Sequence, residues 1–255
     1  MEDADSLLDV RNVVKTFGGI RAVDGLSLSV RKQSITGLIG PNGAGKTTLF
    51  NLITGIYKPE DGEILFRGDR IDGLLPHQVV AQGAVKTFQV PREFKNITVL
   101  ENLMLAAKGN EGERFNRIFV APSKVWDRER QVLAHARSLL EFFELIDLET
   151  ELAKNLSGGQ KKLLELARAL MTEPVLVLLD EPVAGVNRTL AAKILERIQE
   201  LRQQGLTFLI IEHDMDVVMS QCETVIVMHQ GKALAVGTPS EIKANEEVVE
   251  TYLGT

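Results

Sequence analysis

The sequence has little of what exported or membrane-spanning proteins need. It contains a single cysteine, Cys222, so no disulfide can form within the chain, and this suits a reducing compartment. No apolar run approaches the roughly 18 to 20 residues that span a bilayer; the longest, Val175–Leu179 and Leu206–Ile211, have the length of buried strands. The acidic amino terminus lacks the basic and then apolar layout of a signal peptide. We therefore expect a cytoplasmic chain that works on membranes only through a partner.

Positive charge is also scarce. The chain carries 29 basic and 35 acidic residues, for a formal net charge of −6. The composition therefore gives no reason to expect nucleic acid as a partner. At 44% apolar and 25% charged residues it is otherwise ordinary for a globular protein. Its 255 residues are ample for a large core.

The stretch that organises the sequence is a glycine-rich loop that fits G-x-x-x-x-G-K-S/T. Residues 34–39 before it predict a buried strand, and residues 48–53 after it predict an apolar helix. Glycines let the backbone wrap a phosphate chain, while the helix start and Lys46 attract its charge and Thr47 offers a hydroxyl to Mg²⁺. The predicted phosphate-binding residues are Gly40, Pro41, Asn42, Gly43, Ala44, Gly45, Lys46, Thr47 and Thr48.

The alternative interpretation of this loop is a glycine-rich turn that carries a chance lysine. With glycine near 7% of average composition, the four fixed positions should match by accident in roughly one chain in a hundred of this length. The strand and helix in the right order lower that frequency further. We therefore predict nucleotide binding.

The order of expected elements predicts an α/β fold. Leu8–Phe17, Ile20–Val30 and Gly62–Gly68 favour an antiparallel β layer. Residues 91–155 have mostly helical periodicity, and strands then alternate with helices up to a helical tail at Ser240–Leu253. Such alternation favours a mainly parallel sheet covered by helices. We expect one domain, with residues 1–90 and 156–255 as the nucleotide-binding core and β layer and 91–155 as a helical subdomain.

An apolar strand that ends in two carboxylates is the second chemical feature. The run Val175–Leu179 leads directly into Asp180 and Glu181. Beside a phosphate loop, the first carboxylate would lie near Mg²⁺ and the second would orient or deprotonate the attacking water. The alternative is a buried strand that ends in solvated acids.

A third feature is the segment Leu156-Ser157-Gly158-Gly159-Gln160. A serine followed by two glycines begins a helix, which makes a second anion-binding helix start. Taken alone, the segment is equally typical of a glycine-rich helix cap. Here the acidic strand follows it downstream, as it would in a nucleotide-hydrolysing protein.

Together these residues resemble the ATP-binding cassette (ABC) family of transport ATPases, and the resemblance covers essentially the whole chain. It implies a P-loop NTPase fold, ATP and Mg²⁺ as ligands, and two such domains paired head to tail. ATP would lie between the phosphate loop of one domain and the signature of the other. The signature residues acting in trans would be Ser157, Gly158, Gly159 and Gln160.

The resemblance also implies roles for isolated residues. Phe17 would stack on adenine, although the family more often has tyrosine there, and the alternative is a core phenylalanine. Val23 would form an apolar wall beside it. His213 would contact the γ-phosphate and orient the base Glu181. The magnesium set would be Thr47, Gln89 and Asp180.

Two segments depart from the family pattern. Asn187 stands where most members have aspartate, in a segment that bridges the two active sites of a pair. Lys161 and Lys162 replace the usual glutamine and arginine after the signature. Neither change removes a catalytic group, so we expect a hydrolysing subunit rather than an inactive scaffold that only binds nucleotide.

A finer resemblance is to the ATPases of importers for branched-chain and other hydrophobic amino acids. It rests on Ala84–Gln89, Asn96–Leu103, Ala184–Asn187, Glu212–Met215 and Glu250–Gly254. It implies integral-membrane permease partners, a second and different ATPase subunit, and a peripheral position on the cytoplasmic face of the membrane. The alternatives are a urea or other solute importer, a lipopolysaccharide exporter, or an ABC ATPase of ribosomes or DNA repair.

Overall fold

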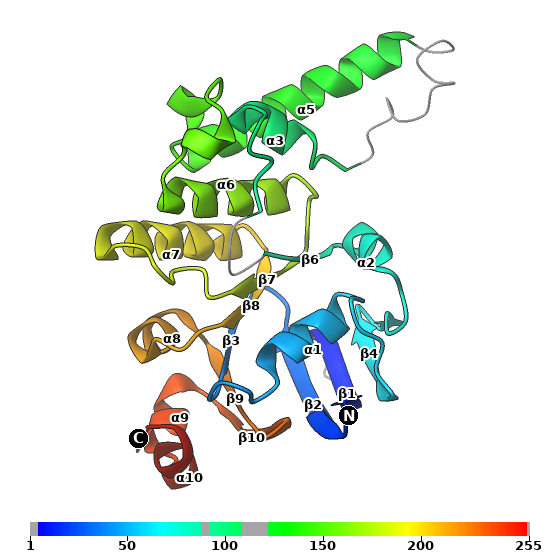
Figure 1. Ribbon diagram of the computed structural model, residues 1–255, viewed down its shortest axis with the longest axis vertical. Helices are drawn as coiled ribbons and strands as arrows, with labels where there is room; N and C mark the ends of the chain where they lie inside the picture. Colours follow the sequence, from blue (N-terminus) through cyan, green and yellow to red (C-terminus); the bar gives the residue numbers. More distant parts are fainter. Residues whose placement is uncertain (1–4, 88–91, 109–121, 254–255) are drawn as a thin grey trace. The chain divides into compact units, whose positions relative to one another are not determined.

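The computed structural model describes residues 5–87, 92–108 and 122–253 (Figure 1). The predicted magnesium contact Gln89 lies outside these ranges. The chain forms two compact units: Met1–Gln89 with Val175–Ala184 and Ala192–Thr255, and Val90–Pro174 with Gly185–Ala191. The second unit thus extends beyond residue 155, where we expected the helical subdomain to end, and includes the helix that begins at the signature.

A six-stranded sheet forms the centre of the first unit. Its strand order is β10 (Lys232–Gly237), β9 (Thr224–His229), β3 (Ile35–Ile39), β8 (Thr207–Ile211), β7 (Leu176–Asp180) and β6 (Ala84–Lys86). All pairs are parallel except β9 with β10. Every residue of β3, β7 and β8 is buried, as expected for parallel strands covered on both faces. The predicted P-loop NTPase architecture with a mainly parallel sheet is confirmed, whereas the antiparallel strand β10 was not predicted.

Six helices of the described residues lie wholly or largely in the first unit. They are α1 (Lys46–Ile53), α2 (Pro76–Gln82), α8 (Met215–Gln221), α9 (Pro239–Ala244), α10 (Glu246–Val248) and the larger part of α7 (Arg188–Gln203). Among them, α1, α7 and α8 follow the parallel strands β3, β7 and β8. The tail that we predicted as one helix is interrupted at Asn245, whose backbone is extended. The Asn245 side chain accepts a hydrogen bond from the N–H of Val248 at 3.2 Å, so it ends one helix and caps the next. A single turn of π-helix, Val249–Leu253, follows.

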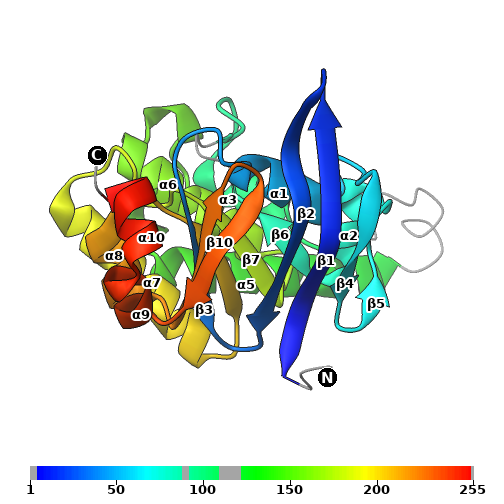
Figure 2. The same ribbon diagram turned by 90° about the horizontal axis from the view of Figure 1, so that it is seen from below.

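The expected antiparallel layer is present beside α1 (Figure 2). Its strand order is β2 (Ile20–Arg31), β1 (Ser6–Phe17), β4 (Asp61–Phe66) and β5 (Asp69–Arg70). Apolar side chains on one face of β1 and β2 share a single core with the buried face of α1, including Phe50, Leu49 and Ile53. This core fixes the start of α1, and with it the phosphate loop, against the strand β2.

The second unit is helical. It contains α3 (Val99–Met104), α5 (Pro122–Phe142), the short 3₁₀ turns Ile146–Leu148 and Ala153–Asn155, and α6 (Gly158–Leu170). Thr98 caps α3 through a reciprocal hydrogen-bond pair with Glu101, as its sequence predicts. Lys161 of α6 pairs with Glu93 at 3.2 Å, and the Arg168 guanidinium lies over the ring of Phe94. These contacts fasten the chain that enters the unit to the signature helix.

The cysteine is structural rather than reactive. Burial raises the pKa of the Cys222 thiol to about 12, with the carboxylates of Glu212 and Glu223 acting in the same direction. A Cβ on Gly37 would lie 2.9 Å from its sulfur, so the two residues pack closely.

No helix in the described part of the chain has both the length and the apolar character to cross a bilayer.

Candidate nucleotide-binding site

The phosphate loop joins β3 to α1, and close backbone approaches explain two of its glycines. Gly45 precedes α1 with φ 103°, and a Cβ there would lie 2.1 Å from the carbonyl oxygen of Ala22. At Gly40, with φ 148°, a Cβ would lie 2.1 Å from the carbonyl oxygen of Met228. Any side chain at either position would collide with backbone and displace the loop. No side chain caps the start of α1, so no side-chain oxygen there competes with a ligand for the first backbone N–H groups of the helix.

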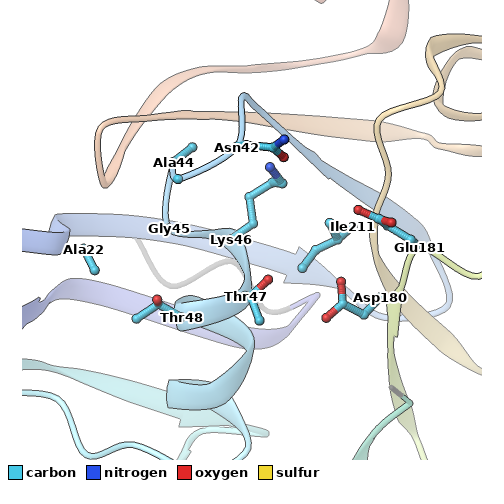
Figure 3. Close-up of a pocket in the computed structure, with 11 residues that line it drawn as sticks. Ala22, Asn42, Ala44, Gly45, Lys46, Thr47, Thr48, Asp180, Glu181 and Ile211 are labelled. Carbon is cyan, nitrogen blue, oxygen red and sulfur yellow. The ribbon is translucent and has the colours of Figure 1, made fainter. Parts of the chain in front are cut away.

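The loop borders a pocket of about 420 Å³ that also receives the ends of β7 and β8 (Figure 3). Residues from sequence positions more than 130 apart meet there, because the carboxyl ends of parallel strands share one edge of the sheet. The lining residues are Ala22, Asn42, Gly43, Ala44, Gly45, Lys46, Thr47, Thr48, Asp180, Glu181 and Ile211. The predicted loop and the predicted acidic strand end are therefore brought together. Ala22 and Ile211 carry no sequence signal that could have identified them.

Lys46 supplies a partly buried positive charge. Its Nζ donates to the carbonyl oxygens of Gly40 at 2.6 Å and Pro41 at 3.0 Å. Burial lowers the pKa of Lys46, while the carboxylates of Glu181 and Asp180 act in the opposite direction. A phosphate anion in the pocket would further stabilise the charged ammonium, because an opposite charge nearby favours the charged form.

Asp180 is the buried acid of the pocket, only 7% exposed. Burial raises its pKa, and Lys86 opposes this through an Nζ–Oδ2 contact of 3.6 Å. Lys86 also donates to Oδ1 of Asn51 at 3.1 Å, so it connects β6 to α1 and β7. No pattern in the sequence singles out Lys86. Its role is visible only once the strands are paired.

The donor atoms around Asp180 fit a magnesium ion. The Thr47 hydroxyl and the Asp180 carboxylate face each other across the pocket (Figure 3). Mg²⁺ prefers oxygen ligands and is usually held by one or two protein groups together with phosphate oxygens and water. A nucleotide on the loop would complete that set. Gln89, the third expected contact, is outside the described residues.

Glu181 and His213 form the other side of the site. The Oε1 atom of Glu181 lies 3.7 Å from Nδ1 of His213. Glu181 has φ 51°, an unfavourable conformation for a residue with a side chain, and its N–H donates to the carbonyl oxygen of Ile211 at 3.0 Å. Strained backbone of this kind is typical of functional sites, where the surrounding fold holds it in place.

The two residues expected at the base of the nucleotide are placed differently from each other. Phe17 ends β1 and is 41% exposed, with its ring 5.1 Å from that of Tyr57 in an edge arrangement and with the Lys15 ammonium above it. An exposed ring is free to stack on a base, unlike a core phenylalanine. Val23, in contrast, is fully buried in the core, and the neighbouring Ala22 borders the pocket instead.

The signature residues lie at the start of α6 in the second unit. Ser157 Oγ accepts from the N–H of Gln160 at 3.3 Å, and Gln160 Oε1 accepts from the N–H of Ser157 at 2.8 Å. Ser157 and Gly158 are exposed, whereas Gly159 is buried and a Cβ on it would lie 1.8 Å from Cδ2 of Leu190. The helix start is thus held by its own capping pair and packed by Leu190.

The structure gives a local reason why asparagine suits position 187. Asn187 Oδ1 accepts from the N–H of Leu190 at 2.9 Å and so caps α7. Aspartate and asparagine are comparable helix caps, so Asn187 keeps this local function without the negative charge. Lys161, the other departure, has the ion pair with Glu93 described above.

Comparison with known proteins agrees with this geometry. The sequence model described as "ABC transporter" matches residues 23–184, and one described as "Branched-chain amino acid ATP-binding cassette transporter" matches residues 234–255. The chain is 43% identical to the probable branched-chain amino acid transport ATP-binding protein LivG of Archaeoglobus fulgidus, over 97% of this chain and 95% of that protein. It is 41% identical to the high-affinity branched-chain amino acid transport ATP-binding protein LivG of Escherichia coli K12, over 97% and 98%.

Solved structures give the same result. A nucleotide-free ATP-binding cassette from an ABC transporter aligns with a TM-score of 0.84 at 40% identity, over 98% of this chain and all of that chain. A cassette in its ADP conformation aligns with a TM-score of 0.83 at 37% identity, over 98% and 99%. With its phosphate loop, acidic strand end and capped signature helix, this chain belongs to the ABC transporter family as an ATP-binding cassette.

Proposed function

We propose that the chain is the ATP-hydrolysing subunit of an importer for branched-chain or other hydrophobic amino acids. The observation that carries the proposal is the identity of 39–43% with ATP-binding proteins named for branched-chain amino acid transport, along nearly the full length of both chains. The match of residues 234–255 to the branched-chain cassette model supports the same substrate class from a separate part of the chain.

In this proposal the pocket residues divide the work on ATP. The loop N–H groups and Lys46 hold the β- and γ-phosphates, and Phe17 stacks on the base. Thr47, Asp180 and Gln89 would hold Mg²⁺, and the ion would supply neutralisation of the phosphate charge. Glu181 orients and deprotonates the attacking water, and its position at the pocket edge favours that role.

His213 would act between the base and the nucleotide. Its Nδ1 already lies 3.7 Å from Glu181 Oε1, close enough to orient that carboxylate after a small rotation. An imidazole is also able to hydrogen-bond a γ-phosphate oxygen through its second nitrogen. The pair would thereby sense whether the γ-phosphate is present.

We further propose that a second ATPase completes the site. The signature residues of this chain, Ser157, Gly158, Gly159 and Gln160, would bind the γ-phosphate of ATP held by the partner. The signature of the partner would bind the γ-phosphate of ATP held by this chain. Closure is then favourable only with triphosphate, and hydrolysis lets the pair open. Permease subunits bound to the helical unit would convert this cycle into alternating access, with the chain on the cytoplasmic face of the membrane. The ATPase partner is expected to be a different chain.

The proposal is tested by reconstituting the chain with the permeases and ATPase encoded beside it in vesicles of bacterial lipid. The cassettes and ATP are enclosed on the inner side of the vesicles, and labelled leucine is added outside with the matching binding protein. We expect the enclosed ATP to drive uptake of the leucine into the vesicles. Vesicles that carry Glu181→Gln in this chain serve as the matched control. Uptake of urea but not leucine, or no uptake while the wild-type complex hydrolyses ATP, would contradict the assigned substrate class.

A further inference from the structure

Glu212 is a buried acid that the mechanism above does not use. It follows β8 directly, between Ile211 and His213, and is 1% exposed. Among the described residues, Asp180 and Glu212 are the two acids in the buried set, and Asp180 already has a role in the pocket. Burying a carboxyl group is costly unless hydrogen bonds compensate for the lost water. The contacts of Glu212 therefore indicate what the burial achieves.

Backbone groups from two catalytic segments meet at this one carboxyl. Its Oε2 atom accepts from the N–H of His213 at 3.2 Å. The nearby backbone N–H groups of Val183 and Asp214 also act to lower the pKa of this carboxyl. Val183 lies two residues after Glu181, so the carboxyl connects the segment of the base with the segment of the histidine.

Other surroundings of the carboxyl point in the same direction. Oε1 makes no hydrogen bond of ordinary geometry within the described part of the chain. Burial raises the pKa of Glu212, opposed by the three backbone N–H groups and by the charge of His213. The carboxylate charge of Glu212 in turn helps to raise the pKa of the Cys222 thiol. The carboxyl thus lies among backbone N–H groups of residues 183, 213 and 214, of which that of His213 makes the hydrogen bond.

The two segments need such a connection because their side chains act together. Glu181 holds an unfavourable φ of 51°, and its N–H bond to the Ile211 carbonyl continues the sheet to this residue. The chain after Glu181 then leaves β7, and His213 is largely exposed. The Glu212 carboxyl lies next to the chain that follows Glu181, beyond the last residue that β7 pairs in the sheet.

We infer that Glu212 is a positioning residue that keeps the Glu181–Val183 and His213–Asp214 segments in register, so that carboxylate and imidazole face the γ-phosphate together. The inference rests on the proposed role of this chain as an ATP hydrolase. Glu212 does not line the pocket, so its loss should affect turnover rather than nucleotide binding. Misplacing a catalytic group by 1 Å costs on the order of 100-fold in rate.

Three substitutions separate positioning from packing. Glu212→Gln keeps an oxygen acceptor at the same place and should retain turnover within about threefold of wild type. Glu212→Asp keeps the acid but withdraws it by one methylene, and should lower kcat by about tenfold. Glu212→Leu removes every acceptor at similar volume and should lower kcat by about 30-fold or more. In all three, the equilibrium affinity for ATP should stay within about twofold of wild type.

A matched control comes from Glu241, which also accepts a backbone N–H, that of Thr238 at 2.7 Å, but at the start of α9. Glu241→Leu should change kcat by less than about twofold. Assays are run on the purified full-length chain, at a temperature where melting curves show each variant folded. If Glu212→Leu does not fold, Glu212→Asp and Glu212→Gln carry the test.

A double-mutant cycle supplies the readout that a merely structural role would not move. In a Glu181→Gln background, adding Glu212→Asp should lower the residual turnover by less than about twofold, because the side chain it positions is already gone. Losses that multiply, or Glu212→Gln as inactive as Glu212→Leu, would overturn the inference. So would full turnover in Glu212→Leu. If the wild-type chain and its complex hydrolyse no ATP, the proposed function fails instead.

Discussion

The two glycine-containing helix starts of this chain solve opposite problems. The start of α1 has no side-chain cap and opens on a pocket that holds a lysine, Lys46, and two acids, Asp180 and Glu181. The start of α6 is closed on itself by the reciprocal pair Ser157 and Gln160. In the proposed function, the first binds and cleaves a phosphate chain. The second offers hydrogen-bond donors on a rigid, exposed end but brings no base and no metal ligand of its own.

In the proposed function, this difference means that cleavage chemistry and the γ-phosphate switch are divided between the two helix starts. A pocket with its own acids can hold nucleotide in one chain, whereas a capped helix start can only add contacts to a phosphate presented by something else. This is what a head-to-tail pair of cassettes requires. Substitutions in one helix start, or in the acids beside it, should therefore affect binding and turnover separately.

The largest effect should come from Glu181→Gln. Removing the base should lower turnover by at least about 100-fold while ATP still binds, because phosphate contacts remain with the loop. The variant should also stay paired when ATP is added, which sedimentation velocity would detect. Turnover within a few-fold of wild type would mean that another group is the base.

The next effect should come from Lys46→Ala. Losing a charge-assisted hydrogen bond to phosphate should weaken ATP binding by about 2 kcal/mol, or about 30-fold. Equilibrium titration with a fluorescent ATP analogue measures this directly. Lys243→Ala on α9 changes an exposed lysine of the same unit and should leave the affinity unchanged. Equal affinities for both variants would remove Lys46 from the binding site.

Ser157→Ala should have a smaller and different effect. ATP affinity of the isolated chain should stay within about twofold of wild type, and turnover should fall by about tenfold, because a donor to the γ-phosphate in trans is lost. Loss of the cap should also lower the unfolding free energy by about 1 kcal/mol.

The control for Ser157 is Thr238→Ala, which breaks the same reciprocal pair at the start of α9. It should cost similar stability but leave turnover unchanged. Turnover that falls equally in both variants would show that the Ser157 effect comes from lost helix stability alone. A weaker ATP affinity of the isolated Ser157→Ala chain would place Ser157 in its own pocket, against the proposed pairing.

The smallest effect should come from position 187. Asn187→Ala removes the hydrogen bond to the N–H of Leu190 and should lower the unfolding free energy by about 1 kcal/mol. Asn187→Asp keeps the cap and should leave stability within about 0.5 kcal/mol of wild type. Chemical denaturation measures both. If Asn187→Ala is as stable as wild type, the cap seen in the structure contributes nothing measurable.

Much of the first helix start could be predicted from sequence because its signals are local. The loop pattern, the flanking strand and helix, and the apolar run before Asp180 are each set by neighbouring residues, and the structure places them as expected. The family membership and the mainly parallel sheet followed from the same signals. Local order was enough there because chain direction and strand pairing follow from the strand–helix alternation.

What could not be predicted depends on contacts between distant residues. The strand β10 has half-exposed, weakly alternating residues and exists only by pairing with β9. The burial of the Lys86 and Glu212 side chains depends on which strands lie side by side, because a single polar residue at a strand end has no periodicity. Glu181 has a left-handed backbone at the turn that follows β7. The local sequence Asp-Glu-Pro does not predict that conformation.

The central claim is that neither helix start hydrolyses ATP without a second chain. The most direct test is the specific ATPase activity of the wild-type chain, measured with excess Mg²⁺ and ATP from nanomolar to micromolar protein. The account predicts that activity per chain falls steeply on dilution and is restored on concentration, as pairing requires. An activity per chain that stays constant across the whole range, with sedimentation showing only monomers, would contradict it.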